Sequence, residues 1–162
     1  MNRRGFLGTA AAGLAGLAGS RAAYAATDAD YVTVRRTEAE WRAMLTDDEY
    51  AVLRNEDTER AYTSPLNDEK REGTFHCKGC DLPLYPSNTK YDSGTGWPSF
   101  WAPLDGDPVR TKRDFVLLIP RTEVHCRRCG GHLGHIFNDG PQPTGERHCL
   151  NGLALTFEPA SA

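Results

Sequence analysis

The sequence has no apolar run long enough to cross a bilayer and no excess of positive charge. Its longest run of small and apolar residues, Phe6–Gly19, has 14 residues, fewer than the roughly 20 that a transmembrane helix needs. The 19 basic and 22 acidic residues give a net charge of −3, so the basic footprint of a nucleic-acid-binding domain is missing. Collagen-like and wholly disordered chains are also excluded, because 39% apolar and 25% charged residues among 162 are ordinary values for one soluble globular domain.

The first 26 residues contain three arginines and no acidic residue. Arg3 and Arg4 precede a Gly- and Ala-rich run, and Ala23–Ala25 (AYA) fits an A-x-A cleavage pattern. A charged start, a short apolar stretch and a small-residue cleavage site form a secretory signal, and the paired arginines resemble a bacterial twin-arginine signal. An ordinary Sec signal and an uncleaved anchor are the alternatives. We expect residues 1–26 to direct export to the periplasm, leaving 16 basic and 22 acidic residues, a net charge of −6, and no stable membrane insertion.

After a lead-in at residues 27–36, we expect one domain over residues 37–162. Thr37 with Glu40, and Thr46 with Glu49, have the spacing of a helical capping box. Apolar residues at helical spacing follow the two boxes: Trp41, Met44 and Leu45, then Tyr50 and Leu53. The pattern predicts two short helices between residues 37 and 55.

Beyond Thr58 the chain consists of short apolar runs separated by Gly, Pro, Asn and Asp. The runs are Thr74–His76, Leu82–Tyr85, Phe115–Ile119 and Leu153–Phe157. Such runs predict strands of an antiparallel sheet or small barrel, and residues 138–143 (NDGPQP) predict a loop. Since no linker is long enough to divide two domains, a single mainly β domain with short N-terminal helices is expected.

Four of the five cysteines form two C-x-x-C pairs, Cys77 with Cys80 and Cys126 with Cys129, with 45 residues between the pairs. Zinc prefers four tetrahedral thiolates, and a two-residue gap lets one tight turn present two sulfurs to one ion. Lys78, Arg127 and Arg128 would offset the negative charge of such a centre. The alternatives are redox-active dithiols or structural disulfides. The spacing favours one zinc ion with a structural role, because four protein ligands leave no open position.

The fifth cysteine, Cys149, is the candidate nucleophile. Its neighbours Arg147 and His148 would lower the pKa of a thiol beside them. His132 and His135 supply two imidazoles on a nearby segment, which suits acid–base chemistry. The alternative is that Cys149 is a small buried hydrophobic residue.

Three blocks of the sequence resemble the signature blocks of the methionine-R-sulfoxide reductases. They are Gly94–Phe100 (GTGWPSF), His132–Pro141 (HLGHIFNDGP) and Arg147–Gly152 (RHCLNG). The resemblance extends from about Thr37 to Glu158 and includes both cysteine pairs.

The resemblance implies a fold, a reaction and a set of site residues. The fold would be two antiparallel sheets forming a small barrel-like core, with zinc held by Cys77, Cys80, Cys126 and Cys129. The enzyme would reduce the R epimer of methionine sulfoxide, free or in oxidised proteins and peptides. Cys149 would attack the sulfoxide sulfur and become a sulfenic acid, and an external thiol such as thioredoxin would recycle it. A monomer with no nucleic-acid partner is expected.

Supporting roles follow from the same resemblance. His135 would protonate the departing oxygen with support from His132, and Trp97 and Phe137 would line the pocket for the S-methyl group. The residues that would orient the imidazoles, water and substrate are Asp139, Arg147 and Asn151.

Two positions depart from the family pattern. Thr95 stands where many members carry a resolving cysteine, so recycling would depend on an external thiol. The alternative, a zinc thiolate acting as the resolver, is disfavoured because it would dismantle the metal site. Gly152 stands where another small residue is common, and little effect is expected. A zinc-ribbon binding module, a cysteine hydrolase and a dithiol oxidoreductase are the competing classes. Dependence on an external reductant together with one tightly held zinc ion would separate the reductase from all three.

Overall fold

The computed structural model describes residues 32–115 and 120–161. The predicted signal segment, residues 1–26, and the first half of the lead-in lie outside the described residues. Within the described ranges, no helix has the length and apolar character needed to span a membrane.

Two short helices open the described domain, as the sequence predicts. Helix α1 covers Glu38–Met44 and helix α2 covers Asp47–Asn55. Both capping boxes form: the threonine side chain before each helix accepts a hydrogen bond from the third helical N–H, and the glutamate side chain at that position accepts one from the threonine N–H. Trp41 is buried in the core, with 4% of its surface exposed.

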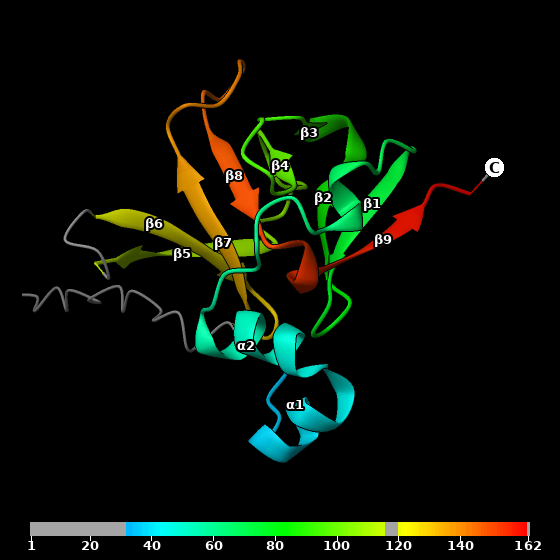
Figure 1. Ribbon diagram of the computed structural model, residues 1–162, viewed down its shortest axis with the longest axis vertical. Coiled ribbons are helices and arrows are strands. Elements are labelled where there is room, and N and C mark those ends of the chain that lie inside the picture. The colour runs from blue at the N-terminus through cyan, green and yellow to red at the C-terminus, as the bar shows by residue number, and fades with distance from the viewer. Residues whose placement is uncertain (1–31, 116–119, 162) are drawn as a thin grey trace, which may run out of the picture.

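The strands form two antiparallel sheets, which confirms the predicted mainly β fold (Figure 1). The smaller sheet has the order β2 (Pro83–Pro86), β1 (Gly73–Cys77), β9 (Leu155–Pro159). The larger has the order β3 (Lys90–Tyr91), β4 (Ser99–Phe100), β8 (Arg147–Leu150), β7 (His132–Phe137), β6 (Arg121–Cys126), β5 (Val109–Asp114). The described residues also contain 3₁₀ turns: η2 (Pro65–Asn67) between α2 and β1, η3 (Ser87–Thr89) between β2 and β3, and η4 (Gly152–Ala154) between β8 and β9.

One predicted strand begins later than expected, and another lies mostly outside the described residues. The described part of the run Phe115–Ile119 is Phe115, which is 63% exposed and lies just after β5; residues 116–119 lie outside the described residues. β5 itself has the polar sequence VRTKRD and is an edge strand, so it carries no apolar run to reveal it. In the run Leu153–Phe157, the strand begins at Leu155, because Leu153 and Ala154 belong to η4.

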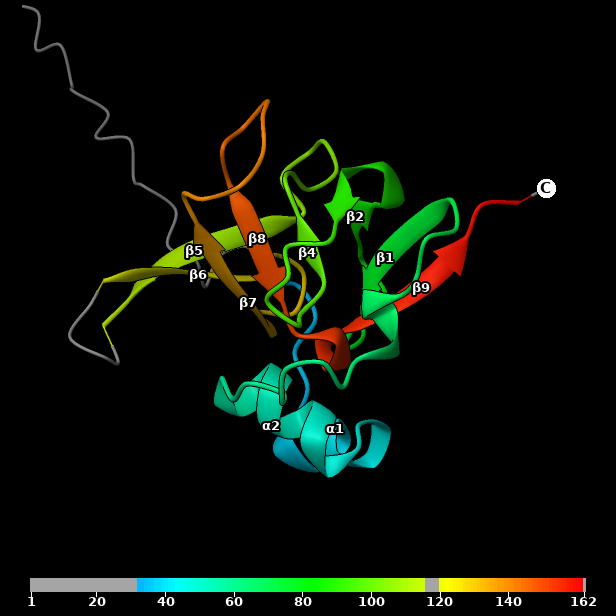
Figure 2. The ribbon, with the colours of Figure 1, turned by 45° about the horizontal axis from the view of Figure 1, so that its top comes forward.

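The core lies between the two sheets. The Phe75 ring of β1 contacts the Phe100 ring of β4, with centroids 4.9 Å apart, and Tyr85 of β2 contacts the same ring at 4.7 Å. These aromatic rings join the small sheet to the strand beside β8. The two helices lie together at one end of both sheets, as Figures 1 and 2 show.

Candidate active site and metal centre

Strand pairing places Cys149 directly between two residues of the predicted site region. On β8, Cys149 lies opposite Ser99 of β4 and opposite His135 of β7. Residues directly opposite in an antiparallel pair project from the same face of the sheet. Cys149 is half-buried on this face, so the sheet brings the predicted nucleophile and the first predicted acid onto one accessible surface.

A row of hydroxyl groups leads to the Cys149 sulfur. Ser99 donates a hydrogen bond to the Trp97 carbonyl oxygen (3.1 Å), and the Ser93 hydroxyl lies 2.7 Å from that of Ser99 and 2.8 Å from that of Thr95. The Thr95 hydroxyl lies 3.8 Å from Cys149 Sγ. Within this row, Thr95 is thus the residue whose hydroxyl reaches the sulfur, at the position where the resemblance would place a resolving cysteine.

The two predicted imidazoles contact each other, with ring centroids 5.4 Å apart. His132 Nδ1 lies 3.0 Å from a Glu123 oxygen, and His135 Nε2 lies 2.8 Å from an Asp114 oxygen. Burial lowers the pKa of His135, although Asp114 opposes the shift, which favours the neutral ring. The sequence did not indicate Glu123 or Asp114, because both lie on the polar hairpin β5–β6, outside the signature blocks.

His148 does not lie beside the Cys149 sulfur, so the expectation that its imidazole is a neighbour of the thiol is wrong. Side chains alternate along a strand, and His148 projects from the opposite face of β8. There its ring nitrogens lie 2.9 Å from the Tyr85 hydroxyl and 3.2 Å from a Glu146 oxygen. Burial lowers the pKa of His148, although Glu146 opposes the shift, which favours a neutral ring.

Arg147, two residues before Cys149, lies on the same face of β8. It makes a bidentate ion pair with Asp139, with distances of 2.9 and 2.8 Å, and its guanidinium lies 4.4 Å from the centre of the Phe137 ring. The Asp139 side chain raises the pKa of Arg147. Arg147, Asp139 and Phe137 thus form one rigid group at the end of β7 and β8, and Asp139 holds the arginine rather than an imidazole.

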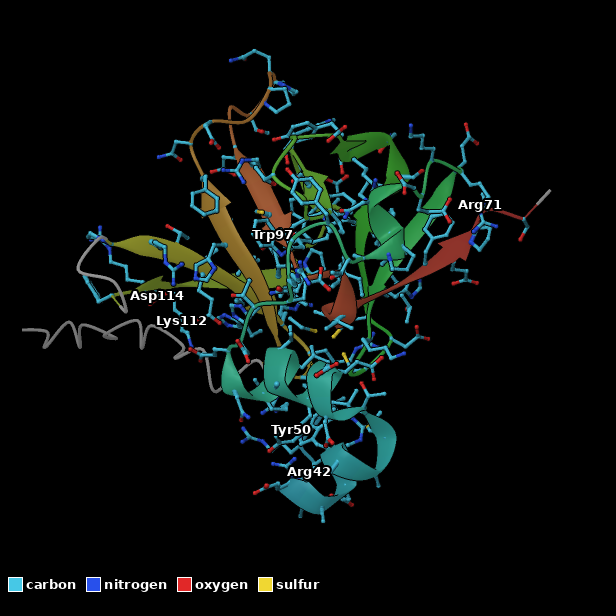
Figure 3. The ribbon with its side chains drawn as sticks, in the orientation of Figure 1. Arg42, Tyr50, Arg71, Trp97, Lys112 and Asp114 are labelled. Atoms are coloured by element: carbon cyan, nitrogen blue, oxygen red, sulfur yellow. The ribbon has the colours of Figure 1, made fainter. Side chains whose placement is uncertain are left out.

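Trp97 and Asn151 both form hydrogen bonds with the backbone of Glu59, a buried residue before η2. The Trp97 indole N–H donates to the Glu59 carbonyl oxygen (3.0 Å), and the Glu59 N–H donates to the Asn151 side chain (3.0 Å). The Glu59 carboxylate accepts the N–H groups of Gly152 and Leu153 at the start of η4. Burial raises the pKa of Glu59. Asn151 therefore fixes the local backbone, and Figure 3 shows Trp97 near the centre of the view, away from Asp114 and Lys112 on β5.

Gly152 is more tightly enclosed than the sequence suggests. A Cβ atom at this position would overlap the Ser64 side chain. A larger residue here would require Ser64, the residue before η2, to move. In this chain, the absence of a side chain at position 152 therefore allows η4 to pack closely against the start of η2.

The four cysteines of the C-x-x-C pairs meet in one cluster, with all Sγ atoms within 4.8 Å of one another. Cys77 lies at the end of β1 and Cys126 at the end of β6. The Cys77 and Cys129 sulfurs are 3.6 Å apart, and those of Cys80 and Cys126 are 3.5 Å apart. These separations exceed the roughly 2.05 Å of a disulfide bond. Tetrahedral sulfurs about 2.3 Å from zinc would be separated by about 3.8 Å, so the cluster is suited to a metal ion.

The cations around this cluster are only partly those predicted. Arg128 donates to the Cys80 carbonyl oxygen (3.1 Å). By contrast, Lys78 pairs with Glu49 (3.0 Å), and Arg127 donates to the Gly106 carbonyl oxygen (3.0 Å).

Two arginines that the sequence did not indicate complete the surroundings of the cluster. Arg54 donates to the Cys129 carbonyl oxygen (3.2 Å) and Arg36 to that of Gly79 (3.4 Å). Both guanidinium groups lie over the Trp41 ring, that of Arg54 at 4.9 Å and that of Arg36 at 4.8 Å from its centre. Their approach depends on α1 and α2, which local spacing around the cysteines does not reveal.

A groove of about 690 Å³ lies between α2 and η4. Its walls include Val52, Arg60, Leu66 and Leu153, but Cys149 is not among its lining residues. The groove is therefore separate from the chemistry described above, and the site is identified from the side chains that meet at Cys149.

Comparison with known proteins agrees with this geometry. The SelR domain model matches residues 45–159. The peptide methionine sulfoxide reductase MsrB of Pseudomonas putida (strain W619) is 52% identical over 126 residues, which cover 78% of this chain and 95% of that protein. The MsrB of Methylibium petroleiphilum is 50% identical, covering 78% of this chain and 91% of that protein. Peptide methionine sulfoxide reductase B1, chloroplastic, of Oryza sativa is 50% identical, covering 75% and 57%. The chain therefore belongs to the SelR-domain family of peptide methionine sulfoxide reductases, MsrB.

Proposed function

We propose that this chain reduces the R epimer of methionine sulfoxide in oxidised proteins and peptides to methionine, with Cys149 as the nucleophile. The observation that carries the proposal is the position of Cys149, which is half-buried and directly opposite His135 on the same face of the large sheet. Membership of the MsrB family supplies the reaction class. A half-buried thiol beside an imidazole and a hydroxyl suits attack on a small electrophile.

The reaction balances with these groups alone. The Cys149 thiolate attacks the sulfoxide sulfur, and the sulfoxide oxygen takes up a proton and is transferred to Cys149. The cysteine sulfur is oxidised by two electrons to a sulfenic acid, and the sulfoxide sulfur is reduced to the thioether. Oxygen is a poor leaving group until it is protonated, so an acid is required. His135, with His132 against it, is the group that we assign to deliver this proton.

Aromatic and cationic groups at the same surface would hold the substrate. Trp97 is half-buried with its N–H tied to Glu59, so one ring face can pack against the S-methyl group, a contact that sulfur and methyl groups make favourably with indole. Phe137, held under Arg147, would line the other side of the pocket.

Recycling of the sulfenic acid would use an external thiol. All four remaining cysteines lie in the metal cluster, and the nearest hydroxyl to the Cys149 sulfur in the described row is that of Thr95. A thiol of a thioredoxin-like protein would attack the Cys149 sulfur and release water. A second thiol of the donor would then reduce the mixed disulfide.

We assign one zinc ion to Cys77, Cys80, Cys126 and Cys129. The sulfur separations fit a tetrahedral centre, and the ion would tie β1 of one sheet to β6 of the other. Because all four ligands come from the protein, the metal would stabilise the fold. Metal analysis of the purified protein should find one zinc ion per chain, and release of zinc by a chelator should accompany unfolding.

We propose that residues 1–26 direct export to the periplasm by the twin-arginine route, which transports folded proteins and would allow zinc to bind reduced thiols first. Fused to a reporter, these residues should export it, and Arg3→Lys with Arg4→Lys should block export. Unchanged export by the double variant would point instead to the Sec route.

The test of the reaction is turnover of separated R and S epimers of a blocked methionine sulfoxide, with dithiothreitol as the reductant. Wild type should reduce the R epimer only, and Cys149→Ser should have no activity while keeping its zinc and its melting temperature. Turnover of the S epimer, or activity in Cys149→Ser, would contradict the assignment. Hydrolysis of esters without a reductant would favour a cysteine hydrolase.

A further inference from the structure

The β5–β6 hairpin presents two carboxylates, each between an imidazole and a cation. Glu123 lies opposite both Lys112 and His135 in strand register, with its oxygens 3.0 Å from His132 Nδ1 and 2.9 Å from Lys112 Nζ. Asp114 lies opposite Arg121.

The Asp114 carboxylate likewise lies between an imidazole and a cation, those of His135 and Arg121. One Asp114 oxygen is 2.8 Å from His135 Nε2 and 2.6 Å from an Arg121 nitrogen. Figure 3 shows Lys112 and Asp114 together on β5.

The first pair is almost fully buried, since the side chains of His132 and Glu123 are 2% and 3% exposed. Although burial opposes it, hydrogen bonds from His132 and Lys112 hold the pKa of Glu123 below its ordinary value. An ionised carboxylate only accepts hydrogen bonds. His132 Nδ1 must therefore carry a hydrogen and donate it to Glu123. When this ring is neutral, its Nε2 carries no hydrogen.

His132 Nε2 is buried and has no hydrogen-bond partner within the part of the chain that the structure describes. A buried polar atom without a protein partner is rare in native proteins, and a catalytic role, a ligand or an ordered water accounts for it. His132 contacts the ring of His135, and His135 is the strand partner of Cys149.

In His135 it is Nε2, rather than Nδ1, that lies against a carboxylate. Its Nε2 lies against the Asp114 oxygen that also binds Arg121, so Nε2 donates and Nδ1 is the unprotonated nitrogen of the neutral ring. Burial favours that neutral ring. The two carboxylates thus select different nitrogens on two imidazoles whose planes are inclined by 64°.

We propose that Glu123 and Asp114 are positioning residues that hold His132 as its Nδ1–H tautomer and His135 as its Nε2–H tautomer, leaving one unprotonated nitrogen of each ring for the reaction. The use of these nitrogens rests on the proposed function, whereas the tautomers do not. With an unprotonated nitrogen available, either ring can accept the proton that Cys149 loses and return it to the sulfoxide oxygen.

Lys112 links this arrangement to helix α2. Its Nζ lies 2.6 Å from the Glu56 carboxylate as well as 2.9 Å from Glu123, and Glu56 ends α2 in a left-handed conformation, with φ of 60°. Lys112 is 44% exposed, so water can replace part of its contribution. Lys112→Met should therefore lower activity less than Glu123→Gln.

The test is nitrogen NMR of the histidine side chains, together with steady-state kinetics on the R-sulfoxide. In wild type, His132 should be protonated at Nδ1 and His135 at Nε2. In Glu123→Gln, the neutral amide both donates and accepts, so the His132 tautomer should become mixed. The kcat should fall by about 10- to 100-fold, the loss expected for a hydrogen bond to a charged group, with KM nearly unchanged. Glu123→Asp should restore the tautomer and part of kcat.

The matched control is Glu146→Gln, which removes the carboxylate beside His148 on the opposite face of β8. It should leave kcat and KM at the wild-type values. A wild-type His132 protonated at Nε2 would overturn the inference even if Glu123→Gln does not fold. It would also be overturned if Glu123→Gln changed neither the tautomer nor kcat. Correct tautomers in a protein that reduces no sulfoxide would instead contradict the proposed function alone.

Discussion

The two cysteine sites of this protein use the same thiol in opposite surroundings. In the metal cluster, four sulfurs lie within 4.8 Å of one another, and three of the four cysteines are buried. At the proposed active site, Cys149 is half-buried and its neighbours are the Thr95 hydroxyl and its strand partner His135. Four clustered thiols can bind a metal ion, and a metal-bound thiolate in a closed site does not react. A single accessible thiol without a metal remains available to act as a nucleophile.

Both sites depend on the large sheet, but at different points along its strands. The cluster takes Cys126 from the end of β6, where the chain turns. Cys149 lies within β8, where strands on both sides fix its direction. Turns therefore bring the four clustered cysteines together, and strand register brings the proposed catalytic groups together.

The largest expected effect separates the two sites directly. Cys126→Ser should remove a metal ligand and unfold the chain at 37 °C, because structural zinc contributes about 10–16 kcal/mol in small metal-dependent folds, comparable to the whole stability of a domain. Cys149→Ser should keep the wild-type melting temperature and lose all reductase activity. Circular dichroism melting curves and zinc content check both variants. A folded, active Cys126→Ser would remove the distinction between the sites.

A glycine substitution tests the strand register. Gly134 lies so close to β8 that a Cβ would overlap the Cys149 carbonyl oxygen. Gly134→Ala should push β7 from β8, lowering kcat/KM by about 100-fold and stability by about 1–3 kcal/mol, with zinc retained. Gly79→Ala is the matched control in the metal cluster, because its Cβ would meet Trp41 and Cys129 at ordinary contact distances of 3.4 and 3.5 Å. Equal losses of activity in both variants would contradict this account.

A smaller effect is expected at Thr95. Its hydroxyl can donate a hydrogen bond to the Cys149 sulfur, and the loss of one such bond is worth about 0.5–1.5 kcal/mol. Thr95→Val should therefore lower kcat/KM by roughly 3- to 10-fold, and Thr95→Ser should keep most of it. Steady-state kinetics on the R-sulfoxide measure both. Wild-type rates in Thr95→Val would show that the hydroxyl row plays no part in the reaction.

The smallest effect concerns the face of β8 turned away from Cys149. Burial in the folded state lowers the pKa of His148 below its ordinary value of 6.5. As the pH falls through 6.5, His148 therefore takes up a proton in the unfolded chain before it does so in the folded chain. The free energy of unfolding should therefore decrease from pH 7 to pH 5, and His148→Gln should decrease less, by about 1 kcal/mol. Urea unfolding of both proteins at each pH measures the difference. A steeper loss in His148→Gln would contradict a buried, neutral His148.

The sequence predicted what depends on local spacing. Capping boxes revealed both helices, and the C-x-x-C spacing revealed the metal cluster, because both depend on residues a few positions apart. It did not reveal Glu123, Asp114 or Arg54, since their contacts depend on which strands pair and on where α2 packs.

The alternation of side chains along a strand explains why His148 does not lie beside Cys149 in the candidate active site. His148 and Arg147 are both neighbours of Cys149 in sequence, yet only Arg147 shares its face. The alternation of side chains along β8 decides between them, and sequence proximity alone did not take it into account.

The central claim is that the two kinds of cysteine have separate roles, and one turnover without reductant tests it most directly. The protein would be mixed with excess R-sulfoxide, the sulfenic acid trapped with a selective reagent, and each cysteine peptide analysed by mass spectrometry. We predict one methionine formed per chain, the trapped oxygen on Cys149 alone, and Cys77, Cys80, Cys126 and Cys129 unmodified with zinc retained. A disulfide within the four-cysteine cluster, or more than one methionine per chain with loss of zinc, would contradict the account.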